Sequence, residues 1–105
     1  MMTTQEVIAA VRERLVEYYG ERFRGLVLYG SMARGTAHAD SDIDLLVLLD
    51  GEVDIIGELW EIVKLVYPLQ LESEYRISCH PADHDMYTRG DWELYRNAKR
   101  EGVSV

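Results

Sequence analysis

The chain has 105 residues, 48% of them hydrophobic and 29% charged, which is the composition of an ordinary soluble globular domain. This length supports one core, so a single domain over residues 1–105 is expected. A formal net charge of −8 argues against nucleic acid as the main partner, because phosphate backbones are bound by basic faces. Cys79 is the only cysteine, which excludes an internal disulfide. The sequence contains no signal peptide or span of eighteen apolar residues, so no membrane partner and a cytoplasmic location are expected.

The first part of the chain predicts a helix followed by a strand. The helix is expected from Thr3 to about Tyr19, because Thr3 and Glu6 have the spacing of a capping box and Gly20 is a natural stop. Its apolar stripe consists of Val7, Ile8, Val11 and Leu15. A polar connector then leads to a short apolar strand, residues 26–29.

The middle of the chain predicts a polar loop, a buried strand and a second helix. Gly30 to Ser41 is rich in turn-forming residues. Ile43 to Leu49 is a continuous apolar run, which indicates a strand buried on both faces at the centre of a sheet. Val53 to Tyr67 has apolar residues at helical spacing, and Pro68 is expected to stop that helix.

The last part predicts a third strand and a short helix. The strand is expected within Leu69–His80, closed by Pro81, with its polar face formed by Glu74, Arg76, Ser78 and His80. A helix is expected over Asp91–Arg100, with Asp91 as its N-cap. Residues 103–105 are either a terminal strand or a loose tail. This order of elements predicts an α+β fold, a small mixed β-sheet flanked by helices.

Residues 26–49 carry the candidate chemistry. Gly30 allows a sharp turn and close approach of a ligand. Ser31 then offers a hydroxyl where a helical turn begins, and backbone N–H groups there point at an anion. Asp42 and Asp44 lie two residues apart at a strand entrance, so both carboxylates face one side. Such a pair favours a cation such as Mg²⁺ together with substrate phosphates. The pattern predicts a pocket for a nucleoside triphosphate.

The spacing Gly30-Ser31, ten residues, Asp42-Ile43-Asp44 resembles the G-S-x10-D-x-D signature of the polymerase-β-type nucleotidyltransferases. The residues around it, 30–35 and 41–47, are similar to the minimal nucleotidyltransferases (MNT). This small prokaryotic family includes antitoxins of HEPN-domain toxins. The resemblance implies a small nucleotidyltransferase fold over the whole chain.

The resemblance also implies roles for individual residues. Asp42 and Asp44 would be catalytic metal ligands, and Gly30, Ser31 and Ser41 would bind nucleotide. Arg34 is the candidate cation for the triphosphate, because a guanidinium matches phosphate oxygens in fork geometry, although a surface role is the alternative.

The family usually has a third carboxylate on the third strand. Glu74 is the candidate catalytic residue for that position, and Glu72 shares its parity. With a different register Ser78 takes the position, and the site would then lack its third carboxylate. Cys79, His80, His84 and Asp85 do not predict a zinc site, because Pro81 interrupts any helix that would align the histidines.

The function implied by the resemblance is Mg²⁺-dependent transfer of AMP from ATP to a protein hydroxyl, a tyrosine of a cognate HEPN toxin. The chain leaves no length for a second, acceptor-binding domain, so a partner chain or a homo-oligomer interface would present the acceptor. The alternative is a binding module, an antitoxin with a vestigial site that blocks its partner by complex formation. A weaker third hypothesis is a sensor that binds ATP without transfer.

Overall fold

The computed structural model describes residues 1–105, and its strands are separated by helices along the chain. In chain order they are α1 (Thr4–Tyr19), the 3₁₀ turn η1 (Gly20–Arg22), β1 (Phe23–Tyr29), α2 (Ser31–Arg34), β2 (Ile43–Leu49), α3 (Ile55–Gln70), β3 (Ile77–Asp83), α4 (His84–Arg89), α5 (Glu93–Glu101) and β4 (Val103–Ser104). None of these helices is long and apolar enough to cross a membrane.

The four strands form one mixed sheet in the order β3-β2-β1-β4. β1 pairs antiparallel with β2 and with β4, whereas β2 pairs parallel with β3. A parallel pair needs a crossover connection, which α3 supplies here. The expected α+β fold with a mixed sheet flanked by helices is therefore confirmed. Of the two alternatives for the chain end, the short strand is the one formed.

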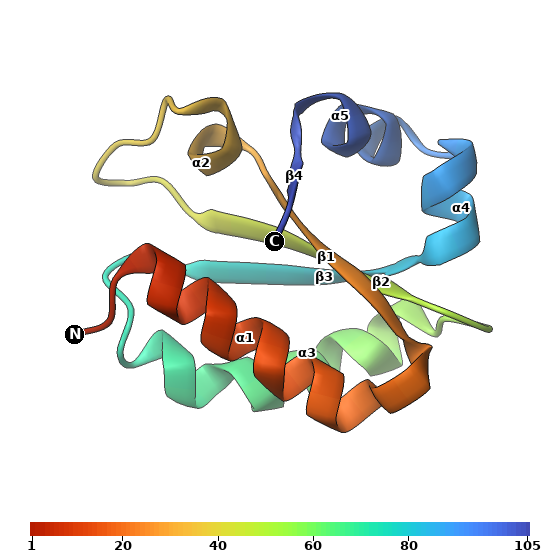
Figure 1. Ribbon diagram of the computed structural model, residues 1–105, viewed down its shortest axis with the longest axis horizontal. Helices are drawn as coiled ribbons and strands as arrows, with labels where there is room; N and C mark the ends of the chain where they lie inside the picture. The colour runs from red at the N-terminus through yellow and green to blue at the C-terminus, as the bar shows by residue number, and fades with distance from the viewer.

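Helices cover both faces of the sheet, as Figure 1 shows. The long helices α1 and α3 lie together on one face, and α5 lies on the other with the short helices α2 and α4. The larger core joins α1 and α3 to the sheet, and a smaller one joins α5 to the opposite face. Every residue of β2 from Leu45 to Leu49 is buried, because β2 is an inner strand that packs against helices on both sides.

The start of α1 is as expected from the sequence. The Thr3 hydroxyl accepts the N–H of Glu6, and the Glu6 carboxylate accepts the N–H of Thr3. This capping box satisfies two N–H groups that lack partners within the helix.

Two prolines were wrongly expected to end their elements. Pro68 lies inside α3, which continues to Gln70. Near the helix end a proline removes one backbone hydrogen bond, and the residue after it, Leu69, is buried in the larger core. Pro81 lies inside β3, which continues to Asp83. Because β3 is an edge strand, one of its sides needs no N–H donors, and proline is tolerated there.

The expected limits of the third strand and of the last helix were also wrong. β3 begins at Ile77, so Glu74 lies in the bend before it. The N-cap of α5 is Trp92, because the Asp91 carboxylate is held 2.8 Å from the Arg89 guanidinium instead. Between β3 and α5 the chain forms α4, a short helix that the sequence analysis did not predict.

Candidate functional site

The turn after β1 packs directly against Asp44. In the sheet, Tyr29 at the end of β1 is the register partner of Asp44 in β2, so the next residue, Gly30, turns across the aspartate. Gly30 has φ 75° and ψ −157°, a conformation that is nearly restricted to glycine. A Cβ atom at Gly30 would also collide with the Asp44 carboxylate. The sequence therefore needs glycine here both for the backbone and for the space beside the carboxylate.

A buried hydroxyl connects the two ends of the loop between β1 and β2. The Oγ atoms of Ser31 and Ser41 are 3.0 Å apart and hydrogen-bonded. The Ser41 Oγ also accepts the N–H of His38 at 2.9 Å. Ser41 is only 7% exposed and is the only polar residue in the buried set. Ser41 thus fixes the position of the Ser31 hydroxyl beside the carboxylates rather than lining an open pocket itself.

Asp42 and Asp44 form the acidic centre of the site. Asp42 immediately precedes β2, and Asp44 is its second residue, so both point to the same face of the sheet. The pKa of Asp44 is raised, first by burial and second by the charge of Asp42, against the opposing effect of His80, Arg76 and Arg34. Two carboxylates in one half-buried place are a donor set that fits Mg²⁺, which would relieve both effects.

Two arginines lie around this centre. The Arg76 guanidinium is 2.7 Å from the Asp42 carboxylate. Arg34, at the end of α2, pairs with Glu101 of α5 at 3.2 Å and is close enough to Asp44 to influence its pKa. Both cations are exposed, and a guanidinium pairs equally well with carboxylate and phosphate oxygens.

The β3 side of the centre carries a serine and a histidine instead of a carboxylate. The register partner of Asp44 in β3 is Ser78. The Ser78 Oγ and the His80 Nε2 are 3.0 Å apart. Glu74 is exposed in the bend before the strand, Glu72 is exposed in the preceding turn, and neither forms an ion pair or side-chain hydrogen bond with the site residues. The structure therefore brings together Gly30, Ser31, Ser41, Asp42 and Asp44, and it leaves Glu74 outside this group.

An apolar groove of about 240 Å³ opens next to His80. It is lined by Tyr29, Leu46, Ile55, Leu59, His80, Pro81, Trp92, Leu94 and Tyr95. Sequence analysis did not assign Arg76, His80 or this groove to the site. The signal was present in the polar alternation of Arg76, Ser78 and His80, but the start of the strand was placed too early to use it.

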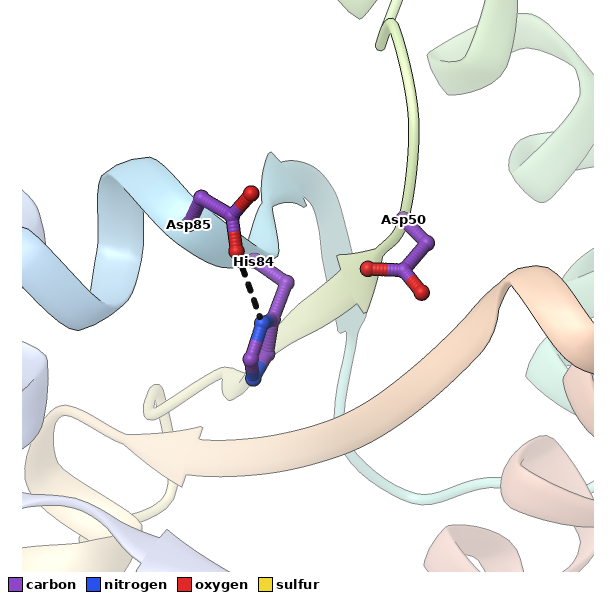
Figure 2. A group of neighbouring side chains, drawn as sticks. All are labelled: Asp50, His84 and Asp85. Carbon is purple, nitrogen blue, oxygen red and sulfur yellow. Dashed lines mark ion pairs between the residues drawn. The ribbon is translucent and has the colours of Figure 1, made fainter.

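A second group of possible metal ligands lies at the opposite end of β2. Figure 2 shows Asp50, just after β2, facing His84 and Asp85 at the start of α4. Their ligand atoms lie within 4.8 Å of one another. Both Asp50 oxygens, however, already accept from the Arg24 guanidinium at 2.8 and 2.9 Å. Asp42 is also paired with an arginine, but through one oxygen only, and Asp44 accepts no side-chain hydrogen bond. The Asp42–Asp44 pair therefore keeps more free carboxylate oxygens than Asp50 does.

Comparisons with known proteins agree with this geometry. A Methanocaldococcus jannaschii protein named as a protein adenylyltransferase is 26% identical over 102 residues, covering 96% of each chain. A chain from a crystal structure of a mutant MntA–HpeT toxin–antitoxin complex superposes with a TM-score of 0.60 at 20% identity, covering all of this chain and 72% of that one. Residues 8–101 match the family model described as a nucleotidyltransferase domain. The expected resemblance to MNT-type nucleotidyltransferases and the expected nucleotidyltransferase activity are confirmed. The chain therefore belongs to the nucleotidyltransferase domain family.

Proposed function

We propose that this nucleotidyltransferase transfers AMP from ATP to a protein hydroxyl, a tyrosine of a HEPN-type toxin, and so acts as an antitoxin. One observation carries the proposal: Gly30 packs against the Asp44 carboxylate, which places the Ser31 turn beside a pair of carboxylates. The name of the M. jannaschii homologue supports AMP transfer. The toxin–antitoxin complex among similar structures supports a toxin as partner.

In this proposal Asp42 and Asp44 hold Mg²⁺. When bound, the ion neutralises charge on the phosphate oxygens and orients the α-phosphate for in-line attack. Gly30 and Ser31 hold the β- and γ-phosphates, and Ser41 keeps the Ser31 hydroxyl in place through their hydrogen bond. Arg34 leaves Glu101 to bind phosphate oxygens, for which its fork geometry is suited.

The second candidate function is an inactive antitoxin that neutralises its partner by complex formation alone. It is favoured by Ser78, which occupies the place beside Asp44 where the family pattern has a third carboxylate. A net charge of −8 suits a basic partner surface. The two candidate functions differ in their dependence on Asp42 and Asp44. AMP transfer requires both aspartates, whereas steric blocking of the partner does not.

The test compares the wild type with Asp42→Asn/Asp44→Asn. We expect the double variant to fold, to bind the partner and to transfer no AMP when the reaction with Mg²⁺ and ATP is followed by intact mass. The matched control is Asp50→Asn, which removes a carboxylate at the far end of the same strand. Transfer retained by the double variant would overturn the site. Tight partner binding without transfer by the wild type would favour the inactive antitoxin.

A further inference from the structure

We infer that the groove beside β3 is the acceptor subsite and that it takes a phenolic side chain, whose hydroxyl is bound by His80. This inference rests on the proposed AMP transfer. In it, the attacking hydroxyl has one binding place on the surface, and His80 takes the role of the third carboxylate of the family pattern.

The topology determines from which side the acceptor must come. Ser31 follows β1, Asp42 and Asp44 belong to β2, and β3 lies on the other side of β2. A triphosphate held at Ser31 directs its departing pyrophosphate toward the β1 side. In-line displacement requires the attacking oxygen to approach the α-phosphorus from the opposite side, which is the side of β3 with Ser78 and His80.

The groove begins on that side. Leu46 is the next residue after Asp44 on the same face of β2, and its register partner is His80. Both line the groove, and so does Tyr29, the register partner of Asp44 in β1. The groove therefore lies next to the acidic centre. A protein acceptor that approaches from the β3 side therefore reaches this groove. The larger groove between α1 and α3 lies elsewhere.

The lining selects an aromatic group. Trp92 and Tyr95 stack with ring centroids 4.9 Å apart and form one wall, and seven of the nine lining residues are hydrophobic. Aromatic faces favour stacked or edge-on rings. At about 240 Å³ the groove is smaller than the roughly 300–1,000 Å³ typical of whole small-molecule ligands. It suits one side chain.

His80 supplies the polar group that a phenol needs. Its ring is exposed at the groove rim, and its Nε2 lies 3.0 Å from the Ser78 Oγ. With Nε2–H donated to Ser78, the Nδ1 accepts the phenolic O–H. In the step, the phenolic oxygen bonds to the α-phosphorus, the bond from that phosphorus to the pyrophosphate oxygen breaks, and the proton passes to Nδ1. The products are AMP-tyrosine, pyrophosphate and protonated His80.

The first arm of the test measures binding without nucleotide or metal. Amide and indole NMR shifts are followed while N-acetyl-tyrosinamide, N-acetyl-phenylalaninamide or N-acetyl-serinamide is added. We expect shifts at Leu46, His80 and Trp92, about fivefold tighter binding of the tyrosine than of the phenylalanine probe, and none of the serine probe. Trp92→Ala abolishes these shifts. Its control is Trp60→Ala, which removes the other tryptophan, 66% exposed on α3. His80→Ala removes only the preference for tyrosine.

The second arm measures AMP transfer to a tyrosine-bearing acceptor. We expect Trp92→Ala to raise the KM of the acceptor and leave that of ATP unchanged. We expect His80→Ala to lower kcat by about 10²-fold or more. Shifts outside the groove, or transfer indifferent to both substitutions, would overturn the acceptor subsite and leave the transferase intact. Groove binding by the tyrosine probe with no transfer from the wild type would instead overturn the proposed function and, with it, the role of the groove.

Discussion

Replacing Gly30 by alanine tests the contact between the turn and the carboxylate on which the site depends. Two costs add at this position. The backbone at φ 75° and ψ −157° is nearly inaccessible to alanine, and such strain costs about 1–3 kcal/mol. The new Cβ would also collide with the Asp44 carboxylate, so that carboxylate must move away from its position on the same face of the sheet as Asp42.

Gly35→Ala provides the matched control. Gly35 also has a positive φ, 74°, but ψ is 19°, and a Cβ there meets no atom within 4 Å. Its cost is the left-handed backbone alone, about 1 kcal/mol. Both variants are measured by urea unfolding and thermal melting. Each loss of 1 kcal/mol in the free energy of unfolding lowers Tm by roughly 4–8 °C for a chain of this size.

Calorimetric titration with ATP and Mg²⁺ then separates the effect of backbone strain from the effect of the displaced Asp44 carboxylate. We expect the Gly30 variant to bind ATP at least about tenfold more weakly than the Gly35 variant, equivalent to about 1.4 kcal/mol. Equal stability losses in the two variants, with equal ATP affinity, would refute the reasoning, because the contact with Asp44 would then have no energetic consequence.

Three further predictions concern the hydrogen bond of Ser41, the buried thiol of Cys79 and the proline inside α3. Ser41→Ala leaves the His38 N–H without its acceptor, so urea unfolding should show a loss of about 1–2 kcal/mol. Burial raises the pKa of Cys79 to about 12 from 9.0; stability is then full below pH 9 and lost as pH rises toward 12, and Cys79→Ala should reduce that alkaline loss in melts across this window. At pH 8 a thiol-reactive dye should label the native protein far more slowly than the urea-unfolded chain. Pro68→Ala restores an N–H within α3 at an exposed position, and a gain of about 1–2 kcal/mol is expected after the offsetting flexibility of the unfolded chain; a loss would show that proline is favoured there.

The parts of the fold predicted correctly are those encoded locally. The capping residues of α1 and the apolar run of β2 are signals within a few neighbouring residues. The turn at Gly30 is another, because its glycine and the aspartates that follow it are close in sequence. Gly30, Ser31, Asp42 and Asp44 make up most of the candidate site and lie within one short stretch of the chain, which is why the family resemblance is visible in the sequence.

The errors come from interactions between distant residues. The alternation that led to Glu74 as a strand residue continues smoothly into β3, but pairing with β2 starts only at Ile77, opposite Ile43. Pro81 is accommodated because β3 is at the edge, which the sequence does not reveal. The missed helix α4 had one local signal, the Asp83 side chain that caps it by accepting the N–H groups of Asp85 and Met86.

The most direct test of the account is to find where the nucleotide-associated metal binds. Mn²⁺ can replace Mg²⁺ and broadens NMR signals of nearby nuclei, so its position is measured directly in the presence of ATP. We expect loss of signals around Gly30, Asp42 and Asp44 in the wild type, and no such loss in Asp42→Asn/Asp44→Asn. Broadening confined to Asp50 and His84 at the other end of β2, or none at either end, would contradict it.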